Sequence, residues 1–305
     1  MNTSTDAAPT HIVVDWGTSR LRASLVDDNG RTFGTVATDQ GIQHVARDTH
    51  AEILCDVINP WRQEFGPKPI YASGMISSRN GWLELPCVPC PAGIAEISAA
   101  MHVVTLDDGL SIHIVPGLVD ESRHPFPDVM RGEETQILGA VMQHGNVVLP
   151  GTHSKWATVE NACIAAFHTV VTGELYRVMR QHSFVAAGPD LDSLNESVFR
   201  QGIAIAKQEP AGLQTHLFGV RAGVLADKLA LDTAGDYLSG LLIGHEFAAS
   251  AIQHEPLLVI GNKSLTQRYL IAADELDIKA MAGPSDAGLL GIRHLRRHHE
   301  TSSPR

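Results

Sequence analysis

Two short stretches of the chain resemble each other, and this similarity constrains the fold more than any other feature. They are residues 11–37, HIVVDWGTSRLRASLVDDNGRTFGTVA, and residues 146–171, NVVLPGTHSKWATVENACIAAFHTVV. Each begins with an apolar run, meets a Gly-Thr pair, continues with alternating apolar and polar residues, and turns into a second β-type run. The Asn-Gly pair at 29–30 suits a hairpin, because type I′ turns need positive φ. A repeated hairpin predicts an internally duplicated fold.

The two Gly-Thr pairs, Gly17-Thr18 and Gly151-Thr152, are the first candidates for ligand binding. At the end of a hairpin they present backbone N–H groups and a hydroxyl, which suits a nucleotide polyphosphate. The alternative is that the repeated hairpin serves architecture alone. We favour phosphate binding.

Length and charge limit the class of protein. The 305 residues allow two domains that share one cleft, or one large domain. A formal net charge of −11 argues against a nucleic-acid partner, which would need a basic face. The first ten residues lack the basic and apolar regions of a secretory signal, and no apolar run approaches the roughly 20 residues of a membrane helix. We therefore expect a cytoplasmic enzyme.

The remaining pattern alternates strands with helices, which indicates mainly parallel sheets covered on both faces. A helix is predicted over 46–65, with Pro60 as a point where it kinks or ends early. The basic cluster at 296–299 is interpreted as the solvated tail of a terminal helix. Cys87 and Cys90 form a C-x-x-C in a proline-rich loop. A zinc or redox site is one interpretation of this pair, and two plain thiols the favoured one.

Asp15 follows the first apolar run, at the end of a strand where such sheets place ligand contacts. A carboxylate and a phosphate are both negative, so they lie side by side only if a cation separates them. We therefore predict that Asp15 contacts Mg²⁺ through water. The alternative is an aspartate that caps a turn.

Glu133 and Glu134 follow Gly132 and begin an amphipathic helix. Acids in a first helical turn often serve only the helix dipole. Here the segment precedes the second hairpin, and the glycine allows close approach to a ligand. A carboxylate at this place could accept a hydroxyl proton as that hydroxyl attacks a terminal phosphate.

Gly261 and Asn262 end an apolar strand and precede a helix, where small residues leave room for a flat ring. This signal is weak by itself, since a strand-to-helix turn needs Gly or Asn anyway.

In this order the motifs resemble the sugar-kinase, Hsp70 and actin superfamily. The resemblance implies an α/β fold of two duplicated actin-like (ribonuclease H-like) βββαβαβα domains around an ATP cleft. It implies an N-terminal domain at 1–143 and a C-terminal domain at 144–305, with a last helix that returns to the first. DWGTSRLR resembles the first phosphate motif, LPGTHSKW the second and VIGNKSLTQRY the adenosine motif. The resemblance extends the ATP and phosphate set to Ser19, His153, Ser154 and Lys155. For Lys155 the alternative is a plain exposed lysine.

The strings SGMISSRNGW, VMRGEETQILGA, TVVTGELY and YLSGLLIGHE narrow the resemblance to the 2-dehydro-3-deoxygalactonokinase family. That resemblance implies an ATP- and Mg²⁺-dependent transferase that phosphorylates the 6-hydroxyl of 2-dehydro-3-deoxy-D-galactonate in galactonate catabolism. Many sugar kinases have Asp where this chain has Glu133, so the choice between Glu133 and Glu134 stays open. The alternatives are a kinase for another sugar or sugar acid, and a nonenzymatic ATP-dependent switch. The expected partners are the sugar acid and ATP, and a homodimer is left open.

The carboxylate of such a substrate needs an arginine fork or backbone amides. Arg79 is the favoured candidate, against the alternative of a solvated surface arginine, and Trp82 could pack on the sugar chain or in the core. The other residues predicted to bind substrate are Arg20, Gly74, Met75, Arg131, Thr172 and Glu174.

Overall fold

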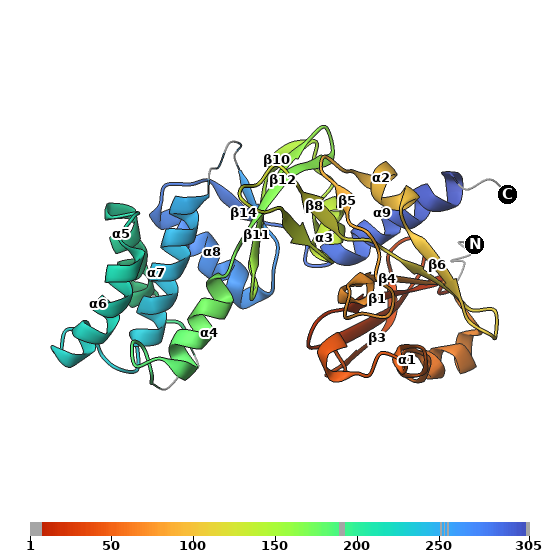
Figure 1. Cartoon of the computed structure of the whole chain (residues 1–305), viewed down its shortest axis with the longest axis horizontal. Coiled ribbons are helices and arrows are strands. Elements are labelled where there is room, and N and C mark those ends of the chain that lie inside the picture. The colour runs from red at the N-terminus through yellow and green to blue at the C-terminus, as the bar shows by residue number, and fades with distance from the viewer. Residues whose placement is uncertain (1–7, 189–192, 251, 253, 255, 303–305) are drawn as a thin grey trace, which may run out of the picture. The chain divides into compact units, whose positions relative to one another are not determined.

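The chain forms two compact units, and Figure 1 labels many of their helices and strands. Unit 1 contains Met1–Gln143, Asn161–Ala166 and Asp286–Arg305, and unit 2 contains His144–Glu160 and Phe167–Ser285. The structure, a computed structural model, describes residues 8–188, 193–250, 252, 254 and 256–302.

Unit 1 is built on a six-stranded sheet with the order β3-β2-β1-β4-β7-β6. Its strands are β1 His11–Trp16, β2 Leu21–Val26, β3 Thr32–Thr38, β4 Ile70–Gly74, β6 His102–Thr105 and β7 Ser111–Ile114. β1 pairs antiparallel with β2 and parallel with β4, and β4 pairs parallel with β7. A second, three-stranded sheet has the order β5-β8-β9, from β5 Val88–Pro89, β8 Leu118–Asp120 and β9 Asp128–Met130.

The helices of unit 1 are α1 His50–Phe65, α2 Ile94–Ala99, α3 Glu133–Gly139 and α9 Ala287–Ser302, with 3₁₀ turns at Ile42–His44 and Met75–Ser77. Two of them, α1 and α9, contact opposite faces of the larger sheet. Leu54 and Ile58 of α1 share a buried core with Ile70 and Ala72 of β4. Tyr71, between those two strand residues, points to the opposite face and contacts Glu300 of α9.

α9 packs against α2 and α3 within unit 1. Glycine allows this close approach: a Cβ added to Gly139 would lie 1.8 Å from the carbonyl oxygen of Ala287, and one on Gly291 would lie 1.7 Å from that of Thr135. Side chains larger than hydrogen at these two positions would push the helices apart. The position of α3 is therefore fixed by α9.

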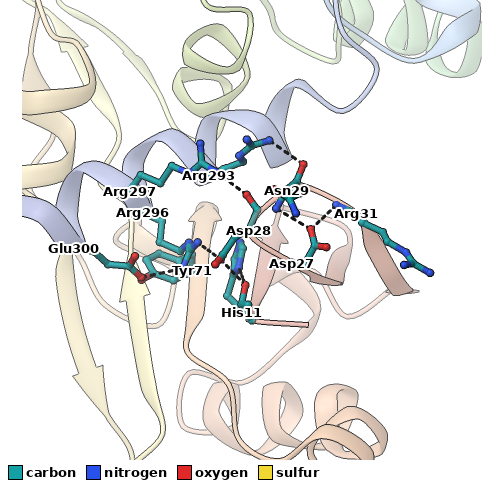
Figure 2. A network of polar contacts seen from close by, with 11 residues as sticks. His11, Asp27, Asp28, Asn29, Arg31, Tyr71, Arg293, Arg296, Arg297 and Glu300 are labelled. Carbon is teal, nitrogen blue, oxygen red and sulfur yellow. Dashed lines mark hydrogen bonds and ion pairs between the residues drawn. The ribbon is translucent and has the colours of Figure 1, made fainter. Parts of the chain in front are cut away.

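Arg296 in the basic cluster of α9 is buried and pairs with Asp28 in the turn between β2 and β3, so the interpretation of residues 296–299 as a solvated tail is wrong at Arg296. Figure 2 shows the buried Arg296 guanidinium between Asp28 and Glu300, and its distance to Glu300 Oε1 is 3.0 Å. Glu300 also accepts a hydrogen bond from the Tyr71 hydroxyl. Burial and the nearby Arg296 charge lower the pKa of His11 to about 4, so that histidine stays neutral.

Unit 2 has a five-stranded sheet with the order β12-β11-β10-β13-β14. Its strands are β10 His144–Leu149, β11 Ser154–Glu160, β12 Cys163–Val170, β13 Leu257–Val259 and β14 Ala280–Ala282, and β12 begins in unit 1. β10 pairs antiparallel with β11 and parallel with β13, which pairs parallel with β14. Five neighbouring strands of the larger sheet of unit 1, in the order β3-β2-β1-β4-β7, have the same arrangement, so the predicted duplication is confirmed. The expectation of mainly parallel sheets is wrong, because each sheet combines an antiparallel hairpin with parallel strands.

The helices of unit 2 are α4 Thr172–His182, α5 Glu196–Gln208, α6 Leu213–Leu225, α7 Ala234–Ala249 and α8 Lys263–Glu275. α5 and α6 both pack against α7, which is buried along most of its length, and the three lie side by side in Figure 1.

In unit 1, the helix predicted over 46–65 begins four residues later and continues through Pro60 to Phe65. Within the described part of the chain, no helix is both long and apolar enough to cross a membrane.

Candidate active site

Asp15 lies one residue before the end of β1, where the sequence places it. Its cross-strand neighbours are Arg22 on β2 and Ser73 on β4. The residue is exposed, yet desolvation by the surrounding protein raises the pKa of its carboxyl, and the Arg22 charge lowers it. Asp15 is thus an accessible carboxylate in a partly desolvated setting, which favours pairing with a cation.

The turn after β1 is closed by its own backbone and supported from behind. The Gly17 amide donates to the carbonyl of Arg20, and the carbonyls of Gly17 and Thr18 accept hydrogen bonds from the Ile42 and Gln43 amides. Thr18 and Ser19 are exposed. The carbonyls of this turn therefore point toward the supporting segment, while its side chains remain accessible to a ligand.

A glycine contact brings the start of α3 next to the end of β1. Gly74 ends β4 with φ +93°, and a Cβ at this position would lie 2.8 Å from the carbonyl oxygen of Trp16 and 3.4 Å from Asp15 Oδ1. Gly132 precedes α3 with φ +104°, and its Cβ would lie 3.2 Å from Gly74 Cα. Both positive φ angles favour glycine. The end of β1 and the start of α3 thus lie on either side of this glycine contact within unit 1.

Glu133 and Glu134 have different surroundings. Glu133 is half-buried, and its Oε2 accepts a hydrogen bond from the Arg131 amide. Glu134 is fully buried, and its Oε2 accepts from the Gly132 amide at 2.7 Å. In the described structure no partner reaches its Oε1. Burial, then the neighbouring Glu133 charge, raise the pKa of Glu134 to about 8, so at neutral pH Glu134 is largely protonated.

The candidates for binding the substrate carboxylate divide into one structural arginine and two accessible ones. Arg131 donates to Ser77 O at 2.6 Å and to Leu85 O at 3.0 Å, so it holds the loop that contains Arg79. Arg79 itself is 83% exposed and forms an ion pair with Glu84. Arg20 is 75% exposed and pairs with Asp39. Arg79 and Arg20 therefore keep accessible guanidinium groups.

Met75 and Trp82 pack against the core of unit 1 while both stay partly exposed. The Trp82 ring stacks on His50 with 6.2 Å between ring centroids. This packing supports the core alternative for Trp82 and leaves part of its ring accessible.

The second hairpin repeats the phosphate-type turn in unit 2. Gly151 and Thr152 lie in the turn between β10 and β11, and the Thr152 carbonyl accepts from the Glu174 amide. A Cβ on Gly173 would lie 2.2 Å from the Gly151 carbonyl oxygen, so the start of α4 packs directly on this turn. His153 Nε2 lies 2.5 Å from Glu174 Oε2. Glu174 is thus engaged by the turn itself.

Three further predicted residues follow that turn or begin α4. Ser154 and Thr172 are buried, so they support the turn from inside the unit. Lys155 is also buried and donates to Thr169 Oγ1 at 2.6 Å. The alternative of a plain exposed lysine is therefore wrong.

A cavity of about 720 Å³ lies at the ends of β13 and β14, within unit 2. Gly261 lines it, as do Thr266, Gln267 and Leu270 of α8 and Ser285. Asn262 caps α8, because its side chain accepts a hydrogen bond from the Leu265 amide. The volume is within the range of about 300–1,000 Å³ that suits small ligands.

Of the two residues predicted from the sequence, Gly261 lines this cavity and Asn262 caps α8 beside it, whereas the helical wall of the cavity was not predicted. Thr266 and Leu270 are four residues apart, so they share one face of the first turns of α8. That spacing after the Gly-Asn pair was the available signal. Arg200, which also lines the cavity, comes from α5, and only the tertiary structure places it there.

The residues at Asp15 fit Mg²⁺ bound mostly by phosphates and water. Among the described residues, no three His, Cys, Asp or Glu side chains gather as a protein-only metal site. A single accessible carboxylate, with the space that Gly74 leaves beside it, suits a hydrated Mg²⁺ that a nucleotide brings. Burial raises the pKa of the Cys87 thiol, and that of Cys90 to about 12, which disfavours the thiolates that zinc or redox chemistry needs.

Comparison with known structures agrees with the fold. A crystal structure of a Sinorhizobium meliloti protein, provisionally assigned as a 2-dehydro-3-deoxygalactonokinase, superposes with a TM-score of 0.84 at 30% identity and covers 97% of each chain. The component A structure of the Acidaminococcus fermentans (R)-2-hydroxyglutaryl-CoA dehydratase shares the fold alone, with a TM-score of 0.50 at 12% identity over 97% of this chain and all of that one. These likenesses place the chain among proteins with an actin-like α/β fold.

The chain belongs to the 2-keto-3-deoxy-galactonokinase family, whose sequence profile matches residues 15–295. The 2-dehydro-3-deoxygalactonokinase of Escherichia coli (strain K12) is 35% identical over 294 residues, which cover 93% of this chain and 97% of that relative. The family assignment from the sequence motifs is thereby confirmed.

Proposed function

We propose that this kinase transfers the γ-phosphate of ATP to the 6-hydroxyl of 2-dehydro-3-deoxy-D-galactonate in the cytoplasm. The observation that supports this most directly is the contact between Gly74 and Gly132. That contact brings an accessible carboxylate, Asp15, and a helix that begins with Glu133 to the same end of one sheet. Family membership supplies the substrate class.

Each unit has its own candidate groups for binding ATP. In unit 2, the cavity beside Gly261 accepts the nucleoside, and the turn at Gly151 and Thr152 contacts phosphate. In unit 1, Asp15 would hold Mg²⁺, and the turn at Gly17 and Thr18 would contact phosphate. Mg²⁺, when bound, neutralises charge on the phosphate oxygens.

Glu133 is proposed as the residue that takes the proton from the attacking hydroxyl. Glu133 is partly exposed and is the first residue of α3, whereas Glu134 is buried and largely protonated. A carboxyl that already holds a proton cannot accept another at neutral pH, so Glu133 fits the base better.

The experiment that tests the function is a substrate screen. Purified protein is incubated with ATP, Mg²⁺ and a panel of sugars and sugar acids, and ADP is detected by a coupled assay. We expect the highest kcat/KM for 2-dehydro-3-deoxy-D-galactonate. A clearly higher value for a sugar without a carboxylate would overturn the assignment and favour another sugar kinase.

Arg79 gives a more specific test on the substrate side. Arg79→Lys keeps the charge but loses the planar fork, so KM for the sugar acid should rise while KM for ATP stays constant. Arg221→Lys, on α6 of unit 2, is the matched control and should change neither constant. Equal KM values for Arg79→Lys and the wild type would place the carboxylate contact elsewhere.

A further inference from the structure

Glu246 is a buried carboxylate in the middle of α7 that the reaction described above does not use. It is 2% exposed, and the protein surrounds it with donors. Trp156 Nε1 donates to its Oε1 at 2.7 Å, and the Tyr269 hydroxyl donates to its Oε2 at 2.7 Å. Side-chain hydrogen bonds from Thr172 and Ser154 add to these two. A buried carboxylate is costly unless it is hydrogen-bonded, and this one is bonded from several sides.

Two of the donors belong to the phosphate-type turn of unit 2. Ser154 is the first residue of β11, immediately after the turn that contains Gly151 and Thr152. Thr172 is the first residue of α4 and precedes Gly173, which packs on the Gly151 carbonyl. Glu246 therefore accepts hydrogen bonds from two residues that adjoin the turn, Ser154 and Thr172.

A third donor belongs to the wall of the large cavity. Tyr269 lies on α8 next to Leu270 and three residues after Thr266, and both of these line the cavity. Its hydroxyl lies 2.9 Å from Ser154 Oγ and also donates to Glu246. Hydrogen bonds thus connect Ser154 beside the turn, Glu246 of α7 and Tyr269 of α8, the helix that forms the cavity wall.

We propose that Glu246 and Tyr269 are positioning residues that hold the turn at residues 150–153 and the wall of the cavity in the relative geometry that ATP requires. This inference rests on the proposed function, because it takes the nucleoside to bind in the cavity and phosphate at the turn. Its consequence is selective: loss of the network weakens the binding of ATP and leaves the binding of the sugar acid nearly unchanged.

The first variant is Tyr269→Phe in the full chain, which removes one hydroxyl and keeps the ring in its packed place against Phe247. We expect the Kd of ATP, measured by calorimetry in the presence of Mg²⁺, to rise about fivefold to fiftyfold, as the loss of a buried hydrogen-bond partner does. KM for ATP should rise in parallel, and KM for the sugar acid should stay within about twofold of the wild type. Tyr237→Phe on α7 is the control, because Tyr237 lines a separate, smaller cavity.

The second variant is Glu246→Gln. Its amide nitrogen cannot accept a hydrogen bond, so one donor that the carboxylate binds loses its acceptor. Its Kd for ATP should rise more than that of Tyr269→Phe. Where this variant fails to fold, Ser154→Ala replaces it, and a double-mutant cycle with Tyr269→Phe should show coupling between the two sites.

Urea unfolding of each variant separates a loss of stability from a loss of geometry. Variants that are destabilised but bind ATP with wild-type Kd would overturn the proposal, and so would equal rises of KM for ATP and for the sugar acid. Calorimetry with ATP and Mg²⁺, without the sugar acid, needs no turnover, so the proposal is tested even if the substrate screen finds no activity on the expected sugar acid.

Discussion

Gly74 and Gly132 meet back to back at the end of the main sheet of unit 1, where a Cβ on Gly132 would lie 3.2 Å from Gly74 Cα. Both residues have positive φ, so a side chain at either position meets steric strain as well as its neighbour. This contact sets the separation between β1, which contains Asp15, and α3, which begins with Glu133.

Gly132→Ala should therefore lower kcat, by about tenfold to a hundredfold, because a small displacement of a catalytic group is costly. Gly109→Ala is the matched control: Gly109 also has positive φ, but a Cβ there meets no atom within 4 Å. Steady-state kinetics of both variants, with thermal unfolding alongside, separates the contact from the backbone strain. Similar kcat values for the two variants would show that the contact has no catalytic role.

Asp15→Asn should lower kcat by about a hundredfold or more and raise the Mg²⁺ concentration needed for half-maximal rate, because it weakens a contact to the metal. The fold should survive, since Asp15 is exposed. Asp56→Asn, an exposed position on α1, should behave like the wild type. Near-normal turnover with an unchanged Mg²⁺ dependence would exclude the metal role of Asp15.

Glu133→Gln should lower kcat by about 10² to 10⁴ with little change in either KM, as the loss of a general base does. Glu134→Gln should be mild near neutral pH, because the glutamine resembles the protonated carboxyl that this site already favours. The comparison is made from initial rates at saturating ATP and sugar acid. A reversed order of effects would assign the base to Glu134, and two fast variants would assign it to neither.

The pH dependence of stability tests the environment of Glu134 separately. Burial raises its pKa from 4.5 to about 8, so the folded protein keeps a proton that the unfolded chain releases. The stabilisation from this proton is fully present below the pKa that Glu134 has in the unfolded chain. It is lost as the pH rises through the pKa that Glu134 has in the folded protein. Between about pH 5.5 and 8.5 the wild type should lose unfolding free energy relative to Glu134→Gln, on the order of a few kcal/mol.

Urea unfolding at several pH values measures this difference. The charged and ionisable neighbours of Glu134, namely Glu133, Arg131 and Cys87, are present in both proteins, so their contribution largely cancels. Parallel pH profiles for the wild type and the variant would mean that Glu134 is ionised in the folded state.

Arg296 should matter for stability and not for substrate binding. Arg296→Met removes a buried guanidinium that pairs with Asp28 and Glu300 (Figure 2), and both carboxylates are about half exposed. Because water can rehydrate them, we expect a loss of about 2 kcal/mol, below the usual cost of breaking a fully buried pair. Arg297→Met, at an exposed neighbouring position, should cost clearly less in the same thermal unfolding measurement. Equal losses would contradict the importance of burial.

Local patterns were sufficient for the hairpins and for the duplication. Apolar alternation that ends at Gly17-Thr18 and at Gly151-Thr152 depends on neighbouring residues alone, so the strand ends and their turns could be predicted from the chain. The same holds for Gly261 and Asn262, since a strand-to-helix turn has local chemistry. These motifs also indicated the family, which the comparisons confirm.

Only the tertiary structure decided which distant side chains become buried together. Nothing within a few residues of Arg296 shows that Asp28 covers it, and the terminal cluster resembled a solvated tail for that reason. In the same way, the contact of Gly74 with Gly132 and the convergence of Ser154 and Tyr269 on Glu246 join segments far apart in sequence. A local pattern specifies the period and ends of an element. Burial and pairing depend on which elements pack together, and that packing is a property of the whole fold.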